Sequence, residues 1–117
     1  MEPTKTILQR LKTSHGDEYS QAEMYYSVLS AINKLKLTQR EIQLIAFTAV
    51  KGNISYANVR EEFCSKYDTS NPTINNMISK LRKMGILVKD ASKVKVNPQI
   101  VLDFKKDVTL EIKLMHG

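Results

Sequence analysis

Amide, hydroxyl and cationic side chains gather in one stretch in the second half of this 117-residue chain. An asparagine amide can hydrogen-bond to both N6 and N7 of adenine, and a threonine can contact the methyl group of thymine. Lysine, arginine and serine are suited to the phosphate backbone. The candidates for base contacts are Thr73, Asn75 and Asn76. The candidates for phosphate contacts are Ser79, Lys80, Arg82 and Lys83, followed by Lys89, Lys93 and Lys95.

The net charge of the chain is +6, and all of it lies in one segment. Residues 79–106 contain eight cations and two acids, whereas the rest of the chain contains ten of each. A clustered basic segment is the electrostatic footprint of a nucleic-acid binder. A basic face that is only solvated, or a patch for an acidic protein, remains an alternative.

Other kinds of site find little support in the sequence. His15 and His116 lie near opposite ends, without the spacing of three or four residues that helical metal ligands need. The single cysteine, Cys64, has no histidine within its own expected helix to activate it and is expected to be a packing residue. We therefore expect a protein that is not an enzyme and has no metal, no cofactor and no evident small-molecule ligand.

Length and hydropathy restrict the class of protein further. No apolar run approaches the roughly 20 residues of a membrane-spanning helix. The first residues, MEPTKTILQR, lack the apolar core of a signal peptide, and a single cysteine fits a reducing compartment. These features predict a single domain over residues 1–117, located in the cytoplasm and without a membrane partner.

A helix over residues 72–84 must position the amides and most of the cations. Ser70 or Asn71 can cap it, Pro72 suits its first turn, and Gly85 is placed to end it. Apolar residues recur at helical spacing and predict its buried face: Ile74, Met77, Ile78 and Leu81. Two short segments around the turn DAS then predict a hairpin over residues 88–96. Its second arm alternates lysine and valine and is expected to end at Pro98.

Three more helices are expected before this one. The sequence SQAE predicts a capping box at Ser20, and TQRE predicts another at Thr38. A third helix is expected to start near Ser55. The first helix has an apolar row at Tyr25, Val28, Leu29, Ile32 and Leu35. The second has a row at Ile42, Ile45, Ala46 and Ala49 and is expected to end at Gly52, and the third has a row at Tyr56, Val59, Phe63 and Tyr67.

The end of the chain carries the clearest strand pattern. Apolar residues alternate with polar ones, which predicts a strand containing Val108, Leu110, Ile112 and Leu114. A lone strand leaves its backbone groups unpaired, so it needs a partner. The partner is either the segment from Lys5 to Leu11 or the same strand of a second chain. That segment could be a short strand or a helical turn, because its apolar residues fit neither period cleanly.

The order helix, helix, helix, hairpin over residues 37–97 resembles a winged helix-turn-helix domain. The likeness is carried by TINNMISKLRKMGIL, which is similar to the family's run from recognition helix into wing. The segment VNPQIVLDF after the hairpin also resembles winged helices of phage and plasmid proteins. The resemblance implies a mainly α fold with a small β component, a recognition helix in the major groove and a basic wing on the backbone. Residues 1–36 then form an N-terminal extension with a packing helix, and residues 98–117 form a C-terminal extension with a strand.

Two functions follow from this resemblance and the charge pattern. The first is binding to double-stranded DNA by a transcription regulator or a replication or packaging factor, as a homodimer or higher oligomer. The alternative is a structural or assembly component of a phage-like particle that uses the same fold and the terminal strand for contacts between proteins. The expected setting is a bacterial cell, a phage-infected host or a virion.

Overall fold

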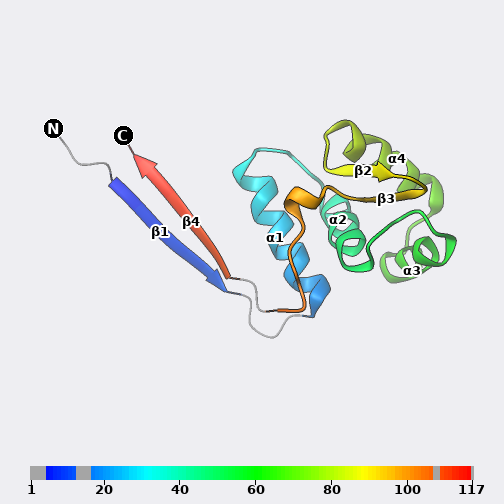
Figure 1. Cartoon of the computed structure of the whole chain (residues 1–117), viewed down its shortest axis with the longest axis horizontal. Helices are drawn as coiled ribbons and strands as arrows, with labels where there is room; N and C mark the ends of the chain where they lie inside the picture. Colours follow the sequence, from blue (N-terminus) through cyan, green and yellow to red (C-terminus); the bar gives the residue numbers. More distant parts are fainter. Residues whose placement is uncertain (1–4, 13–16, 107–108, 117) are drawn as a thin grey trace.

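The computed structural model describes residues 5–12, 17–106 and 109–116 (Figure 1). This part of the chain is mainly helical, with two separate pairs of antiparallel strands, so the expected fold class of α structure with a small β component is confirmed. The elements in order are β1 (Lys5–Lys12), α1 (Glu18–Ile32), α2 (Gln39–Lys51), α3 (Ala57–Tyr67), α4 (Asn71–Lys83), β2 (Leu87–Asp90), β3 (Lys93–Val96), the 3-10 helix η1 (Pro98–Ile100) and β4 (Thr109–His116).

Helix α1 begins before the expected capping box. Asp17 is the N-cap, and its carboxylate accepts a hydrogen bond from the Ser20 N–H at 2.8 Å. The prediction of a cap at Ser20 was therefore wrong, because Asp17 lies three residues earlier and an aspartate serves equally well as a cap. Ser20 is the third residue of the helix instead.

The buried face of α1 also differs from the expected one. Ala22, Tyr26 and Ser30 are buried, whereas Ile32 is 58% exposed. Leu35 lies beyond the end of the helix. The reason is tertiary, because η1 and the segment after it pack on α1. The Tyr26 hydroxyl donates to the Ile100 carbonyl at 2.7 Å, and the Phe104 ring lies 5.7 Å from the Tyr26 ring.

Helix α2 is the centre of the core. Thr38 and Glu41 form the expected capping box, and Gly52 ends the helix with φ of +90°, in the region that favours glycine. The predicted residues Ile42, Ile45 and Ala46 are buried, and so are Leu44, Phe47 and Thr48. This helix is covered on most of its circumference, so its buried surface is wider than one apolar row predicts.

Helices α3 and α4 complete the helical layer on the other side of α2 from α1 (Figure 1). Val59 and Phe63 of α3 are buried as expected, but Tyr56 is the N-cap residue and is 43% exposed, so its assignment to the inner face was wrong. The buried row of α4 is confirmed at Ile74, Met77, Ile78 and Leu81. Gly85 follows α4 with φ of +77° and turns the chain into β2.

The hairpin β2–β3 is hydrogen-bonded to the loop between α2 and α3, and one further backbone hydrogen bond closes its base. Leu87 pairs with Val96 and Asp90 pairs with Lys93, which leaves a two-residue turn at Ala91 and Ser92. The Ile54 N–H donates to the Val94 carbonyl at 2.9 Å, so the hairpin lies against the loop between α2 and α3. The Asn97 N–H donates to the Ile86 carbonyl at 2.8 Å. The expected end of the strand at Pro98 is confirmed, because η1 starts there.

The two ends of the chain form a separate ribbon. β1 pairs with β4 antiparallel over eight residues, from Lys5 opposite His116 to Lys12 opposite Thr109. The terminal strand therefore finds the first of its two expected partners within the same chain. Its predicted member Val108 lies outside the described residues. The ribbon extends away from the helices, and the molecule measures 58 × 32 × 25 Å (Figure 1).

Across the described ranges, no helix combines the length and the apolar character that crossing a membrane requires.

Candidate nucleic-acid interface

The outer face of α4 carries every polar and cationic residue that the sequence assigned to it. Because the apolar row of α4 is buried, the residues between those positions are forced outward. All seven are exposed to solvent: Thr73, Asn75, Asn76, Ser79, Lys80, Arg82 and Lys83. At the start of the helix, the hydroxyls of Thr73 and Ser70 are hydrogen-bonded to each other at 3.1 Å.

Helical spacing divides this face into a central row and two flanks. Asn76, Ser79 and Lys83 stand three and four residues apart and form the row that lies opposite the buried face. Lys80 and Thr73 form the flank towards α2, and Asn75 and Arg82 form the flank towards α3. Ser79, Arg82 and Lys83 line a shallow depression on this surface. Among the described residues, neither Arg82 nor Lys83 makes an ion pair.

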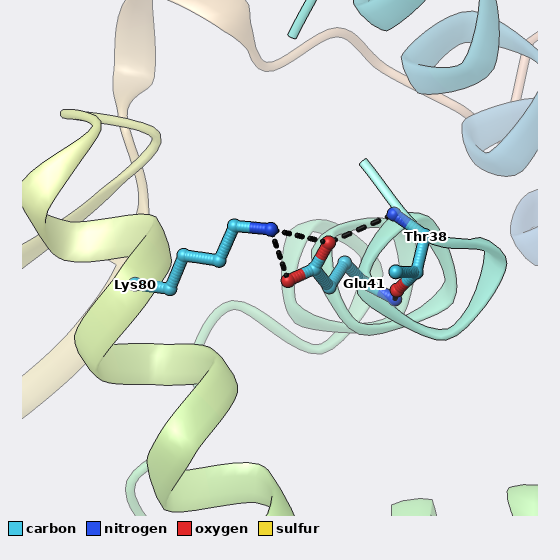
Figure 2. Close-up of polar contacts among 3 residues, drawn as sticks. All are labelled: Thr38, Glu41 and Lys80. Carbon is cyan, nitrogen blue, oxygen red and sulfur yellow. Dashed lines mark hydrogen bonds and ion pairs between the residues drawn. The ribbon is translucent and has the colours of Figure 1, made fainter. Parts of the chain in front are cut away.

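On the α2 flank, Lys80 is joined to the capping box of α2 (Figure 2). Its ammonium Nζ lies 3.0 Å from Glu41 Oε1 and 2.9 Å from Oε2. Glu41 Oε1 also accepts from the Thr38 N–H at 2.8 Å, and the Glu41 N–H donates to the Thr38 hydroxyl at 3.1 Å. One buried carboxylate thus caps α2 and pairs with a lysine in the last turn of α4. Lys80 keeps 47% of its side chain exposed, so its outer surface still faces solvent.

Burial and pairing act in opposite directions on the charge of Glu41. Loss of solvent alone would raise the pKa of this carboxyl. The hydrogen bond from Lys80, the Thr38 N–H and the positive charge of Lys80 outweigh burial, so the pKa of Glu41 lies below its ordinary value. Glu41 is therefore ionised at neutral pH, and Lys80 is the cation that compensates it.

On the α3 flank, Arg60 fixes the amide of Asn75. An Arg60 Nη donates to Asn75 Oδ1 at 2.7 Å, and its Nε donates to the Ile54 carbonyl at 3.0 Å. The Asn75 oxygen therefore already accepts one strong hydrogen bond, and the amide nitrogen still has its two N–H donors for other partners. Arg60 was missed by sequence reasoning, since its partner lies 15 residues away on another helix and no local pattern signals the contact.

The hairpin lysines do not lie on one face. Directly paired residues share a face of a two-stranded sheet, so Lys89 lies on the face of Leu87, Val94 and Val96. Lys93 and Lys95 lie on the opposite face with Asp90. Lys95 Nζ contacts Asp90 Oδ2 at 2.9 Å, and this hydrogen bond and its charge lower the pKa of Asp90. Lys93 is exposed, with its Nζ 5.9 Å from the centre of the Tyr56 ring.

A cavity of about 340 Å³ lies elsewhere, between α1, α2 and η1. Its walls are mostly apolar and include Leu29, Ile45 and Ile100. Asn33 and Asn97 also line it. The Asn33 amide donates to the Leu29 carbonyl, and the Asn97 amide donates to the Gly85 carbonyl. This cavity therefore presents apolar walls and amide nitrogens that are already hydrogen-bonded.

No set of three or more His, Cys, Asp or Glu residues placed to hold a metal ion is found in the described ranges. Comparison with protein-family models, with curated proteins and with solved structures gave no match for this chain.

Proposed function

We propose that this protein binds double-stranded DNA, with α4 in the major groove and the hairpin β2–β3 on the sugar–phosphate backbone. The arrangement α2, α3, α4, β2 and β3 is the order of a winged helix-turn-helix domain, and α4 is its recognition helix. Such a protein would act as a transcription regulator or as a replication or packaging factor.

The outer face of α4 carries the proposal. A helix fits the major groove only if a whole side is free of other elements and carries groups that bases and phosphates accept. The exposed side of α4 has its amides in the first half and its cations in the last turn. Most DNA-binding affinity comes from phosphate contacts, and Arg82, Lys83 and Lys93 are exposed cations suited to them.

Asn76 is the favoured residue for reading a base. It belongs to the central row, and bidentate pairing with adenine needs both its amide oxygen and its amide nitrogen. Asn75 is less suited to this pairing, because its oxygen already accepts from Arg60. Its N–H groups fit a phosphate oxygen or a guanine acceptor instead. Thr73 fits contact with a thymine methyl, so a preference for A·T pairs is expected.

The test is binding to random-sequence duplex DNA by fluorescence anisotropy over a salt series. The variant Arg82→Gln/Lys83→Gln removes two charges from α4. The matched control Lys105→Gln/Lys106→Gln removes two charges directly after Phe104, whose ring packs against Tyr25 and Tyr26 of α1. Each neutralised phosphate contributes roughly −0.9 to the slope of log K against log salt. We expect the α4 variant to lose about two such contacts, and the control to keep the slope of the wild type.

Equal salt slopes in the two variants would contradict binding through α4, since the overall positive charge of the protein would then account for binding. No binding by the folded wild type at low salt would contradict the proposal as a whole.

The second candidate, an assembly component, is favoured by one observation, namely the β1–β4 ribbon that extends from the helices. Lys80 is not substituted in the DNA-binding test, because its ammonium also compensates the charge of Glu41.

A further inference from the structure

The register of the β1–β4 ribbon gathers most of its apolar residues on one face. Residues directly opposite each other in an antiparallel pair share a face, and faces alternate along each strand. Ile7 is opposite Leu114, Gln9 is opposite Ile112, and Leu11 is opposite Leu110. Five apolar positions thus share one face with Lys5, Gln9 and His116. The other face includes Leu8, Met115 and the pair of Arg10 and Glu111.

Two strands do not complete a stable sheet. An isolated two-stranded ribbon is marginal in water, and three or more strands with an apolar face are needed for independent stability. Each outer edge also presents unpaired N–H and C=O groups that can accept another strand. In Figure 1 the ribbon runs away from the helices, with β1 on its outer side and β4 on the side of α1. Among the described strands, none is paired with the outer edge of either one.

Charge distinguishes the two edges. The charged residues of β1 are Lys5, Arg10 and Lys12, all cations, so two copies of β1 would bring like charges together. Strand β4 instead carries Glu111 and Lys113, an acid and a base two residues apart on the same face. Opposite charges directly across from each other stabilise strand pairing, and like charges destabilise it. The edge formed by β4 is therefore suited to pairing with a second β4.

Only one register of that pairing satisfies both the charges and the apolar face. A symmetric antiparallel pair centred on Ile112 sets Glu111 opposite Lys113 of the second copy, and Leu110 opposite Leu114 of the second copy. Centring on Glu111 or on Lys113 would set like charges opposite each other. Centring between two residues would set apolar positions beside polar ones, since a shift of one residue exchanges the faces.

We propose that this protein forms a homodimer through β4, with the two strands antiparallel and a two-fold axis at Ile112. The product is a four-stranded sheet in the order β1, β4, β4 of the second copy, β1 of the second copy. Its apolar face is continuous across the axis and contains ten apolar positions, five from each chain. This pairing does not depend on DNA binding, although it would place two copies of α4 in one particle.

The test measures molar mass by sedimentation equilibrium of the full chain, from micromolar to several hundred micromolar at low salt, where charge pairs are least screened. Glu111→Lys sets lysine opposite Lys113 twice across the axis, and Lys113→Glu sets two acids opposite each other twice. We expect each single variant to weaken the dimer at least about tenfold. The double variant Glu111→Lys/Lys113→Glu restores both opposite pairs and should dimerise again.

The double variant is a matched control for folding of the ribbon. It carries the same lysine opposite Arg10 within the chain as Glu111→Lys does, so the two differ only at residue 113. An equimolar mixture of the two single variants should also dimerise, because every charge then faces its opposite. A monomeric wild type over the whole range would overturn the proposal. So would a dimer that all the charge variants leave unchanged, since another surface would then join the copies.

Discussion

At the scale of single residues, Lys80 illustrates how one side chain can have two roles. Its type and its place on the outer face of α4 are those of a phosphate contact, yet its ammonium also compensates the buried carboxylate of Glu41. Removing the lysine leaves that carboxylate without its cation, and an unpaired buried charge costs more than the pair contributes.

Substitution Lys80→Met is expected to destabilise the fold by about 1–2 kcal/mol at neutral pH, less than for a fully buried pair, because solvent reaches Lys80. The pKa of Glu41 is lowered in the folded state, so its contribution is complete above the ordinary value of 4.5 and is lost as the pH falls through the lower folded value. The difference between wild type and variant should therefore shrink on acidification. Urea unfolding at several pH values measures it, and Lys83→Met serves as the control. A difference that stays constant with pH would contradict the role of Glu41.

Asn76 and Lys83 lie in the same central row but are expected to act differently on DNA. Asn76→Ala should cost about 1–3 kcal/mol on the preferred site and little on random DNA, because base contacts carry the sequence information. Lys83→Gln should weaken binding to both kinds of DNA and reduce the salt slope by about one contact. The comparison uses a site obtained by selection from random duplexes. Equal losses on both DNAs for Asn76→Ala would indicate that its amide reads no base.

At the scale of elements, the turn of the hairpin is strained at one residue. Ala91 has φ of +55°, a left-handed conformation that costs a side chain roughly 1–2 kcal/mol. Two-residue turns with a positive φ at the first position favour glycine there. The short hairpin therefore forms although its turn lacks the residue that suits it, because its strands are held by the loop between α2 and α3.

Substitution Ala91→Gly should consequently stabilise the protein by about 0.5–1 kcal/mol, since the strain removed exceeds the entropy that glycine adds to the unfolded chain. Ser92→Gly is the control, because Ser92 is not among the residues with positive φ and gains nothing from glycine. Thermal unfolding of both variants decides the matter. A loss of stability at Ala91→Gly equal to that at Ser92→Gly would show that the turn is not strained.

At the scale of the whole molecule, the segment after the hairpin ties α1 to the remaining helices. Phe104 is 3% exposed and contacts the rings of Tyr25 and Tyr26, and its carbonyl accepts from the Gln21 amide at 3.0 Å. The same segment connects β3 to β4, so its docking determines where the ribbon emerges from the helical part (Figure 1).

Substitution Phe104→Ala should destabilise the protein by about 3–5 kcal/mol, as for other large buried rings. Amide exchange should accelerate first in α1 and around Ile100, because the contact between them is lost. Leu102→Ala is the matched control, since Leu102 is 43% exposed and its loss should cost about 0.5 kcal/mol or less. Similar costs for the two variants would mean that Phe104 does not hold the segment in place.

The sequence by itself determined several local features, although it misplaced the cap of α1. The capping box at Thr38, the end of α2 at Gly52 and the buried row of α4 follow from hydrogen bonds and side-chain periodicity within a few residues. The outward face of α4 could be predicted for the same reason, since a helix that buries one row must expose the opposite one.

Only the tertiary structure decided the contacts between distant segments. Lys80 and Glu41 are 39 residues apart, and the strands β1 and β4 come from opposite ends of the chain. The buried face of α1 was predicted wrongly because the segment that covers it, from Ile100 to Phe104, arrives more than 70 residues later. A side chain's neighbours depend on how complete elements pack, and no spacing along a single element contains that information.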